Sequence, residues 1–559
     1  MGKPKPEKNK TKDVKPTKTS VKKEDKDMSY LPSKYMFLFV GILAALTAVI
    51  LTNDDLKLYL VKLTPMGSQP LETIMNTANS ESSSQTGPGS EPVVSPEPID
   101  PTPSQATKKS NNDEKESDDK KMKKKDYKKS SITNKADFKL RKQLDEADDL
   151  LQQRNVDGAI RLYDDVLREN SKSPRALFGK GMSLDILAEQ KRSNQLLGEA
   201  ISSMDAALRA PNVPAELLRI ISEKLAERQT FRGWNHKAAQ TWKYMSDKYP
   251  DNVDYKRKLT VSYLTMGDNV MAREILKNIL DKNPKDGFSL VHLGFILKTV
   301  DLNYEEGSRL LQEGIDTQEH GTVDGRFYYH LGDAYMRINR TDMSSKVYKK
   351  GAELGLFLSE HQRSLYNAET KLTGRPWWTP EQTPYGRYLA MLEKNWETIR
   401  DEGLSLLDQK TGGFLPEEEN LREKGDWKQF TLYQRGKKND VNCRRTPKTC
   451  ALLDQVPDAT SCTRGQIKFS VMHPGVHVWP HTGPTNCRLR AHLGLRIPEG
   501  PRIRVADKTK TWKEGKFIII DDSFEHEVWH DGTESRLILI VDFWHPDIPL
   551  QERRTLSPI

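Results

Sequence analysis

Apolar residues are scarce in this chain of 559 residues. They make up 35% of the sequence, while charged residues make up 30%. A chain with so few apolar residues does not bury a core along its whole length, which excludes a uniformly folded protein and predicts that part of it is disordered. The length predicts two or three domains.

Arginine is absent from the first 34 residues, which hold 11 Lys against 5 Asp or Glu. A second basic cluster spans Lys120–Lys129. Neither cluster has interleaved aromatic residues on a predicted fold, as nucleic-acid recognition would favour. We therefore do not predict nucleic-acid binding, and we interpret residues 1–34 as a basic, solvated tail.

Charge is absent from residues 35–52, which read YMFLFVGILAALTAVILT. At about 1.5 Å per residue, this segment nearly crosses a hydrocarbon core of roughly 30 Å. A cleaved signal peptide is the alternative, but the long basic leader and the lack of a small-residue cleavage site favour an uncleaved signal-anchor. The positive-inside rule then predicts a cytosolic tail, with residues 53–559 in a lumen or outside the cell.

Cysteine is also rare, since the chain has four, all between residues 443 and 487. Cys443 and Cys450 flank a short loop and are predicted to form a disulfide, which an oxidising compartment allows. Cys462 and Cys487 are interpreted as buried thiols, and their redox state stays open.

The region before the cysteines divides into a linker and a helical part. Residues 53–135 are rich in charged residues, Ser and Pro, and predict a disordered linker. Residues 136–374 have helical periodicity, and Pro250 and Pro284, 34 residues apart, each end a helix. This helix-turn-helix period resembles tetratricopeptide repeats, which are usually binding or positioning surfaces. Asn339 opens an Asn-Arg-Thr glycosylation sequon, usable if this region is lumenal.

Short alternating strands separated by Gly, Pro and Asp turns dominate residues 375–559. Such strands predict an antiparallel sandwich, for instance a double-stranded β-helix or jelly roll. A helix over about 384–408 is expected first, followed by strands over 465–472, 488–496, 501–505, 517–520 and 536–543. The predicted protein is therefore multidomain: one transmembrane helix, a linker, helical repeats and a strand-rich domain.

Two histidines and an arginine carry the strongest chemical signal. His481 stands in Trp-Pro-His-Thr-Gly and His526 in Asp-Ser-Phe-Glu-His, while Arg536 precedes the apolar run LILIV. Neutral imidazoles suit a first-row transition metal, and a buried guanidinium suits a carboxylate. Together they indicate non-haem iron with a dicarboxylate cosubstrate.

Residues 526–530 also match H-E-x-x-H, the zinc-protease motif. That motif needs a helix, on which imidazoles four residues apart converge on one ion. The neighbouring residues predict strands and turns, so a protease is a minor alternative. His473, His477 and His481 share the same spacing, but the prolines between them exclude a regular helix.

The stretches SVMHPGVHVWPHTGPTNCRLRAHLGL and KTWKEGKFIIIDDSFEHEVWHDGTESRLILIVDFWHPD closely resemble the aspartyl/asparaginyl β-hydroxylases, which are 2-oxoglutarate- and Fe(II)-dependent oxygenases. The resemblance covers residues 375–559. It implies hydroxylation of Asp or Asn in epidermal-growth-factor-like domains, with Fe(II) as cofactor and 2-oxoglutarate and O2 as cosubstrates. It also implies a single-pass type II protein of the endoplasmic reticulum membrane with a lumenal catalytic domain.

The resemblance assigns roles to individual residues. His481 and His526 match the iron ligands, and Arg536 matches the partner of the far carboxylate of 2-oxoglutarate. Gly483 stands where most of the wider oxygenase class has a ligating carboxylate, so water is expected there. Ser470, Met472, Arg490 and His492 match the cosubstrate pocket, and Lys468, Arg488, Arg422, Gln429, Glu417, Glu419 and Tyr366 match the polypeptide cleft.

A membrane-tethered repeat scaffold with a degenerate oxygenase domain is the non-enzymatic alternative. The missing carboxylate at Gly483 favours it, while the intact set of His481, His526, Arg490 and Arg536 opposes it. Binding of iron and 2-oxoglutarate distinguishes the two hypotheses.

Overall fold

The computed structural model describes residues 127–407, 412–417 and 419–559. The predicted cytosolic tail, the signal-anchor and the part of the predicted linker up to residue 126 lie outside the described residues. Within the described ranges, no helix combines the length and apolar character that a membrane crossing requires.

The end of the predicted linker is folded rather than disordered. Tyr127, Thr133 and Asn134 are buried. The Tyr127 ring packs edge-on against Phe138, with centroids 5.7 Å apart, and its hydroxyl donates to Asp145. Residues 127–135 therefore belong to the folded helical part, because these side chains find partners there that composition alone does not reveal.

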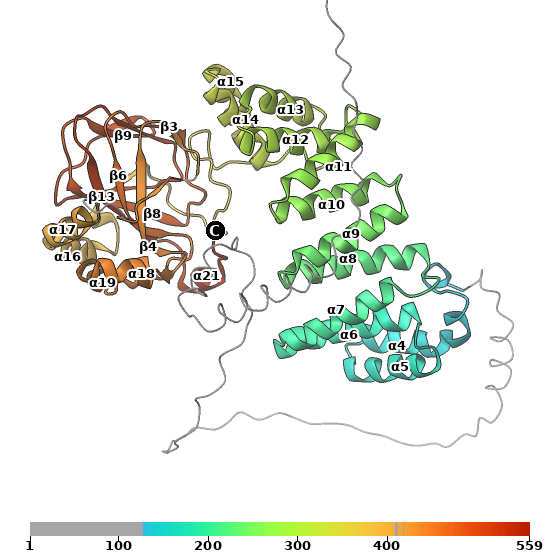
Figure 1. Ribbon diagram of the computed structural model, residues 1–559. Coiled ribbons are helices and arrows are strands. Elements are labelled where there is room, and N and C mark those ends of the chain that lie inside the picture. Colours follow the sequence, from blue (N-terminus) through green and yellow to red (C-terminus); the bar gives the residue numbers. More distant parts are fainter. Residues whose placement is uncertain (1–126, 408–411, 418) are drawn as a thin grey trace, which may run out of the picture. The chain divides into compact units, whose positions relative to one another are not determined.

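Residues 141–353 form consecutive helices that pack on one another, as Figure 1 shows. Pro250 and Pro284 each follow a helix end by two residues, as predicted, and side-chain oxygens of Ser, Asn and Asp cap many N-termini. The helical repeats are thus confirmed. Their helices are α4 (Arg141–Gln152), α5 (Val156–Glu169), α6 (Pro174–Lys191), α7 (Asn194–Leu208), α8 (Ala215–Phe231), α9 (Asn235–Lys248), α10 (Val253–Thr265), α11 (Asn269–Lys282), α12 (Gly287–Thr299), α13 (Tyr304–Asp316), α14 (Gly325–Arg337) and α15 (Thr341–Glu353).

Close helix contacts explain two glycines of the repeats. A Cβ on Gly294 in α12 would lie 2.8 Å from the backbone nitrogen of Leu311 in α13. A Cβ on Gly307 in α13 would lie 3.0 Å from the backbone nitrogen of Lys298. Only glycine lets these two backbones approach so closely, so larger side chains would separate α12 from α13.

After residues without regular helix or strand, the chain forms two antiparallel sheets. The larger has the order β1-β11-β8-β13-β6-β4-β2, with β5 beside β4, and the smaller has the order β10-β9-β12-β7-β3. All five predicted strands are present: β6 (Gln466–Met472), β8 (Arg488–Arg496), β9 (Pro501–Val505), β11 (Phe517–Ile520) and β13 (Arg536–Trp544). The remaining strands are β1 (Trp377–Trp378), β2 (Leu415–Pro416), β3 (Arg422–Lys424), β4 (Trp427–Gln434), β5 (Lys437–Lys438), β7 (His477–His481), β10 (Lys508–Lys510) and β12 (His526–His530).

The predicted helix over 384–408 is two helices. α16 (Gly386–Lys394) ends at Asn395, whose side-chain amide donates to the carbonyl of Met391 at 2.8 Å, and α17 (Trp396–Leu407) follows. The side-chain amide thus takes up a carbonyl of the last turn, and α16 ends there. The short helices of this domain are α18 (Asp440–Arg445), α19 (Pro447–Leu453), α20 (Pro457–Thr460) and α21 (Leu550–Thr555).

The larger sheet buries both of its faces. Residues such as Phe469 and Leu539 pack on the side of α16 and α17, whereas Met472 and Ile538 pack against Val478 and other residues of the smaller sheet. Side chains alternate along a strand, so Lys468, Ser470 and Met472 of β6 share the face toward the smaller sheet. This face carries the functional side chains.

Candidate functional site

Nearly all predicted site residues line one cavity of about 500 Å³. Its walls come from β6, β8 and β13 of the larger sheet and from β7, β9 and β12 of the smaller one. Arg422 is absent from the lining. The predicted residues that line it are His481, His526, Arg536, Ser470, Met472, Arg490, His492, Lys468, Arg488, Gln429, Glu417, Glu419 and Tyr366.

Strand pairing brings His481 and His526 together. They are directly opposed residues of the antiparallel neighbours β7 and β12. Their ring centroids lie 4.1 Å apart at an interplanar angle of 54°. Two residues 45 positions apart in the sequence thus present adjacent imidazoles to the cavity.

Hydrogen bonds select the same tautomer for both histidines. Nδ1 of His481 lies 2.7 Å from the carbonyl oxygen of Trp479, and Nδ1 of His526 lies 2.9 Å from that of Phe524. A carbonyl only accepts, so each Nδ1 carries a proton and each Nε2 keeps a lone pair. Burial lowers the pKa of His481 and lowers that of His526 to about 3. Two neutral nitrogen donors of this kind fit a first-row transition metal such as Fe(II).

A third protein ligand is missing from the described residues, which contain no group of three His, Cys, Asp or Glu side chains placed to hold one ion. Gly483 does not simply lack a carboxylate. A Cβ at this position would lie 2.6 Å from a carboxylate oxygen of Asp522, and the Gly483 amide donates to the Asp522 carbonyl at 2.6 Å. Asp522 therefore occupies the space that a side chain at 483 would need.

Arg536 is a buried cation without a carboxylate partner among the described residues. Its side chain is 1% exposed, and one terminal nitrogen donates to Ser470 Oγ at 3.1 Å, while Nε has no partner. The guanidinium carbon lies 4.8 Å from the centre of the Trp512 ring. Burial lowers the pKa of Arg536 to about 9. A buried guanidinium is costly unless an anion pairs with it, so this end of the cavity fits a carboxylate.

Ser470 and His492 complete the polar lining around Arg536. Ser470 Oγ accepts from both Arg536 and the Trp427 indole, the latter at 3.0 Å. Nδ1 of His492 accepts from the Trp512 indole at 3.3 Å, which leaves Nε2 as a buried donor that no described residue pairs with. The unpaired donors of Arg536 and His492 both line the cavity, and both suit carboxylate oxygens.

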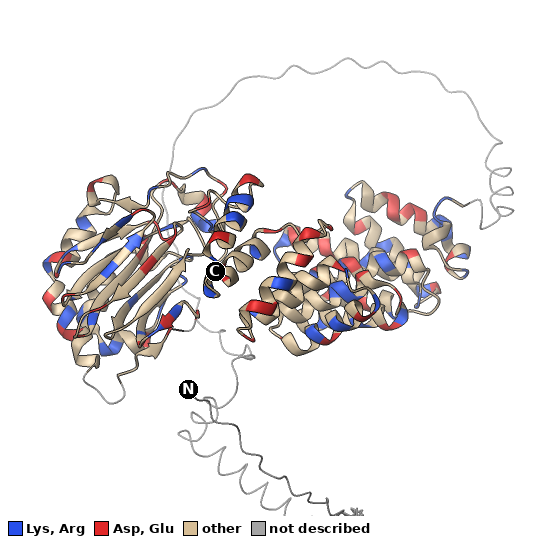
Figure 2. Cartoon of the chain, turned by 90° about the horizontal axis from the view of Figure 1, so that it is seen from above, with Lys and Arg blue, Asp and Glu red and all other residues tan. Residues whose placement is uncertain are grey.

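Arg488 and Arg490 form a buried ion-pair network with Asp522 and Asp542. Arg488 makes a two-pronged contact with Asp522 at 2.7 and 3.2 Å, and Arg490 makes one with Asp542 at 2.8 and 2.9 Å. Although burial raises the pKa of Asp522, the two guanidinium groups hold it well below its ordinary value. These arginines are thus already paired, unlike Arg536. Figure 2 shows Lys and Arg beside Asp and Glu along the strands.

Lys468 is another cation of the cavity that makes no ion pair within the part of the chain that the structure describes. It is 7% exposed and lines the cavity, and burial, followed by the charge of Arg490, lowers its pKa to about 8. Gln429 contributes a side-chain oxygen that has no hydrogen-bond partner among the described residues. The carboxylate of Glu417 accepts from the amides of Glu419 and Leu421, so it shapes its own loop rather than lying in solvent.

The two remaining substrate candidates lie at the edge of the site. Arg422 of β3 lies opposite Val478 of β7 and does not line the cavity. The side chain of Tyr366 is 51% exposed at the rim, while its carbonyl accepts from Thr485 at 2.6 Å. Arg422 thus lies outside the cavity lining, unlike the other predicted substrate residues.

The helical repeats supply lining residues that the sequence did not reveal. Phe295 of α12 and Arg326, Tyr329 and His330 of α14 line the cavity. Their local pattern is that of ordinary helix residues, so no sequence signal distinguishes them. Trp427, Trp512 and Asp522 were also missed, and of these only Asp522 stands near a predicted ligand in the sequence, four residues before His526.

The H-E-x-x-H match lies on strand β12, not on a helix. Nε2 of His530 lies 2.7 Å from the carbonyl oxygen of Glu534, and Nδ1 accepts from the Gly532 amide at 3.3 Å. Both ring nitrogens are therefore occupied. His530 has no lone pair for zinc, which argues against the protease hypothesis.

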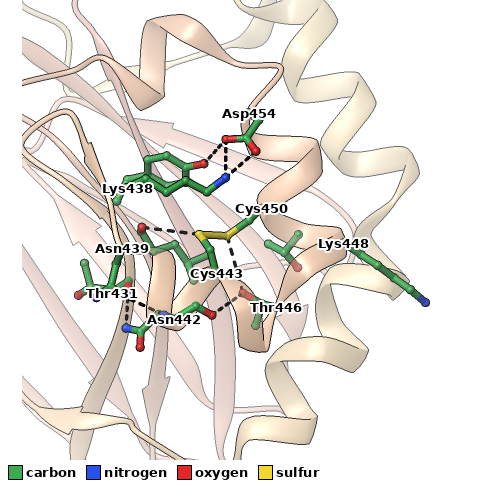
Figure 3. The surroundings of a disulfide bond; sticks show 12 residues. Thr431, Lys438, Asn439, Asn442, Cys443, Thr446, Lys448, Cys450 and Asp454 are labelled. Atoms are coloured by element: carbon green, nitrogen blue, oxygen red, sulfur yellow. Dashed lines mark hydrogen bonds and ion pairs between the residues drawn. A yellow bond between two sulfur atoms is a disulfide. The ribbon is translucent and has the colours of Figure 1, made fainter. Parts of the chain in front are cut away.

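Cys443 and Cys450 form the predicted disulfide, which joins α18 to α19 with Cα atoms 5.6 Å apart (Figure 3). Cys462 and Cys487 are free and buried, in agreement with the interpretation as buried thiols. Asn339 of the predicted sequon is exposed in the turn between α14 and α15.

A family model described as Aspartyl/Asparaginyl beta-hydroxylase matches residues 393–546. The chain is 48% identical over 433 residues to the Aspartyl/asparaginyl beta-hydroxylase of Homo sapiens, covering 77% of this chain and 57% of that protein. The Mus musculus protein of that name gives the same identity and covers 77% and 58%. The chain thus spans less than two thirds of the length of these relatives.

A solved tetratricopeptide repeat protein from Parabacteroides merdae is 17% identical and covers 49% of this chain and 91% of its own, with a TM-score of 0.28. At this score the likeness adds nothing to the helical arrangement described above. The family resemblance drawn from the sequence motifs is confirmed by the family model and by the two relatives.

Proposed function

We propose, because a family model described as Aspartyl/Asparaginyl beta-hydroxylase matches residues 393–546, that the chain is a 2-oxoglutarate-dependent Fe(II) oxygenase that hydroxylates the β-carbon of peptidyl Asp or Asn. One observation carries the proposal. Two neutral imidazoles with available Nε2 atoms share a cavity with Arg536, a buried guanidinium that lacks a carboxylate partner among the described residues. The two-sheet domain is interpreted as the double-stranded β-helix of such oxygenases.

Each cavity residue has a task in this proposal. His481 and His526 would hold Fe(II) through Nε2, and Arg536, with Ser470 and His492, would bind the far carboxylate of 2-oxoglutarate. Bound Fe(II) with 2-oxoglutarate and O2 supplies the oxidising chemistry. Met472, Trp512 and Ile538 exclude water from this end of the cavity, which strengthens the guanidinium–carboxylate contact.

The polypeptide would enter where Lys468, Gln429, Glu419 and Tyr366 line the cavity. The Lys468 ammonium group, which has no acidic partner among the described residues, suits the carboxylate or amide oxygen of a target side chain. We propose epidermal-growth-factor-like domains as substrates, on the strength of the family resemblance. The helical repeats, which contribute Tyr329 and His330 to the lining, would help orient them.

We also propose that the protein is a single-pass type II protein of the endoplasmic reticulum membrane with its catalytic domain in the lumen. The disulfide between Cys443 and Cys450 and the exposed sequon at Asn339 support an oxidising, glycosylating compartment. A shift in gel mobility after removal of N-linked glycans, lost in Asn339→Gln, tests this proposal. An unaltered mobility in both proteins would contradict lumenal exposure of Asn339.

The activity is tested by incubating the chain with Fe(II), 2-oxoglutarate, oxygen and an epidermal-growth-factor-like peptide. Mass spectrometry should show the gain of one oxygen on Asp or Asn. His481→Ala should abolish the gain, whereas His473→Ala, a matched change of a nearby histidine outside the cavity lining, should retain it.

Two other outcomes separate the alternatives. Succinate release without peptide oxidation would mean an oxygenase with another polypeptide substrate. No product of either kind from folded, iron-loaded protein would favour the non-catalytic scaffold, which the missing third ligand makes the second candidate.

A further inference from the structure

A short segment between the repeats and the first strand contacts both loops that carry the metal-binding histidines. We name residues 359–368 the bridging segment. One loop is residues 482–486, directly after His481, and the other is residues 521–525, directly before His526. The bridging segment lies outside the matched family region of 393–546, so its contacts are a separate observation.

Three hydrogen bonds join the bridging segment to the loop before His526. The Glu525 amide donates to the His361 carbonyl at 2.7 Å, and the Gln362 side-chain amide donates to Ser523 Oγ at 2.9 Å. The Arg363 guanidinium binds the Glu525 carboxylate at 2.9 Å. The residue adjacent to His526 is thus held through both its backbone and its side chain.

The same segment holds the loop after His481. The amides of Leu365 and Tyr366 both donate to the Pro484 carbonyl, at 3.1 and 2.9 Å. Thr485 Oγ1 donates to the Tyr366 carbonyl at 2.6 Å, and the Ala368 amide donates to the Asn486 side chain at 3.0 Å. Both loops are therefore fastened to one stretch of ten residues.

Arg363 ties this stretch to the last repeat helix. Its side chain is 1% exposed, and its guanidinium carbon lies 3.8 Å from the centre of the Tyr348 ring in α15. It also donates to the Glu360 carbonyl at 2.6 Å. The planar guanidinium is thus fixed by an aromatic face, a carbonyl and a carboxylate, a combination that lysine cannot reproduce.

We propose that the bridging segment is a clamp that holds both histidine-bearing loops in place, with Arg363 as its positioning residue. This clamp compensates for the lack of a third metal ligand among the described residues. A two-histidine site binds its metal ion more weakly if binding must first order the imidazoles. Residues that fix the orientation of the ligands therefore raise the affinity for the metal. The inference rests on the proposed metal site. It adds that the helical repeats take part in metal binding through Arg363.

The test measures binding of Mn²⁺, in the presence of 2-oxoglutarate, to the whole chain by electron paramagnetic resonance. Arg363→Met keeps much of the apolar part of the side chain but removes the guanidinium group. It should weaken Mn²⁺ binding about 10-fold or more, as do changes to residues that support metal ligands without binding the metal. Arg363→Lys should restore only part of the affinity. Gln362→Ala, which removes the contact to Ser523, should have a smaller effect in the same direction.

The matched control is Arg340→Met. Arg340 lies in the turn before α15, and its ion pair with Glu305 at 2.7 Å joins two exposed side chains. This variant should bind Mn²⁺ like the unaltered chain, since exposed ion pairs contribute little. Thermal unfolding of each variant shows whether the helices and sheets remain folded.

The outcomes separate the inference from the proposed function. Equal Mn²⁺ affinity and equal spectra in Arg363→Met, Gln362→Ala and the control would overturn the clamp while leaving the metal site intact. No Mn²⁺ binding by the unaltered chain would overturn both. If Arg363→Met fails to fold, Gln362→Ala decides: reduced Mn²⁺ affinity supports the clamp, and unchanged affinity overturns it.

Discussion

The two sheets of the C-terminal domain differ in what burial does to their functional side chains. On the smaller sheet, burial lowers the pKa of His481 and His526, so both stay neutral and retain lone pairs. On the larger sheet, Arg536 is also buried, yet its pKa of about 9 leaves it charged at neutral pH. The same desolvation thus leaves neutral imidazoles on one wall of the cavity and a charged guanidinium on the other, because guanidinium starts from a far higher pKa than imidazole.

The largest expected effect on activity comes from removing the charge of Arg536 in the larger sheet. Arg536→Met should raise the KM for 2-oxoglutarate by about 100-fold or more, since loss of one partner of a buried charge pair costs about 2–5 kcal/mol. Arg536→Lys should also weaken 2-oxoglutarate binding, because an ammonium group cannot make the two-pronged contact of a guanidinium with a carboxylate. Steady-state kinetics with varied 2-oxoglutarate would measure this. An unchanged KM would mean that the cosubstrate binds elsewhere.

The second prediction concerns Gly483, two residues after His481 of the smaller sheet, and its effect on stability and metal binding. Gly483→Asp supplies the missing carboxylate, but its Cβ would meet Asp522 at 2.6 Å. We expect about 1–3 kcal/mol of lost stability, the usual cost of overpacking, and no tighter metal binding. Denaturant unfolding and Mn²⁺ titration would measure both quantities. Tighter metal binding at unchanged stability would show that the space at 483 is not limiting.

The charge of Lys468 predicts a pH dependence. Its pKa of about 8 means that the ammonium form is present below pH 8 and is lost as the pH rises through that value. The kcat/KM for a peptide with a target Asp should therefore fall several-fold between about pH 7 and pH 9. Lys468→Arg should remove this fall. A profile that is flat in the unaltered protein would exclude Lys468 as the substrate cation.

The smallest effect is expected for His530→Ala. Both ring nitrogens of His530 bond to backbone groups near Glu534 and Gly532, so the change should cost about 1–2 kcal/mol of stability while leaving kcat within about twofold. Kinetics beside thermal unfolding would separate the two effects. Abolished activity with a normal fold would revive the zinc-protease hypothesis.

Strands with regular alternation were predictable from the sequence. β6, β8, β9, β11 and β13 lie where the apolar pattern and the turns predicted them. β7 and β12, which carry the two proposed iron ligands, were not among the strands predicted from regular alternation, although the turns around residues 526–530 predicted a hairpin there. Their side chains mix histidine, proline and charge, because the functional face of a strand departs from the apolar pattern that identifies ordinary strands.

Several features of the site depend on contacts between distant residues. The absence of a carboxylate at Gly483 is visible in the sequence, but its cause, the nearby carboxylate of Asp522, is not. Arg488 and Arg490 share a strand face by alternation, yet their pairing with Asp522 and Asp542 depends on the register of β8 with β13 and on the loop after β11. Residue patterns do not encode such partners directly.

The sequence by itself determined the classes of structure and the types of chemical group. Periodicity determined helical repeats and strands, and residue identity determined which side chains supply imidazole, guanidinium and thiol groups. Only the tertiary structure decided which histidine nitrogens stay available, which cavity arginine lacks a carboxylate partner among the described residues, and how Arg363, in the segment after the repeats, reaches Glu525. The physical reason is that these properties arise from desolvation and hydrogen bonding between residues distant in the chain, and both exist only once the chain has folded.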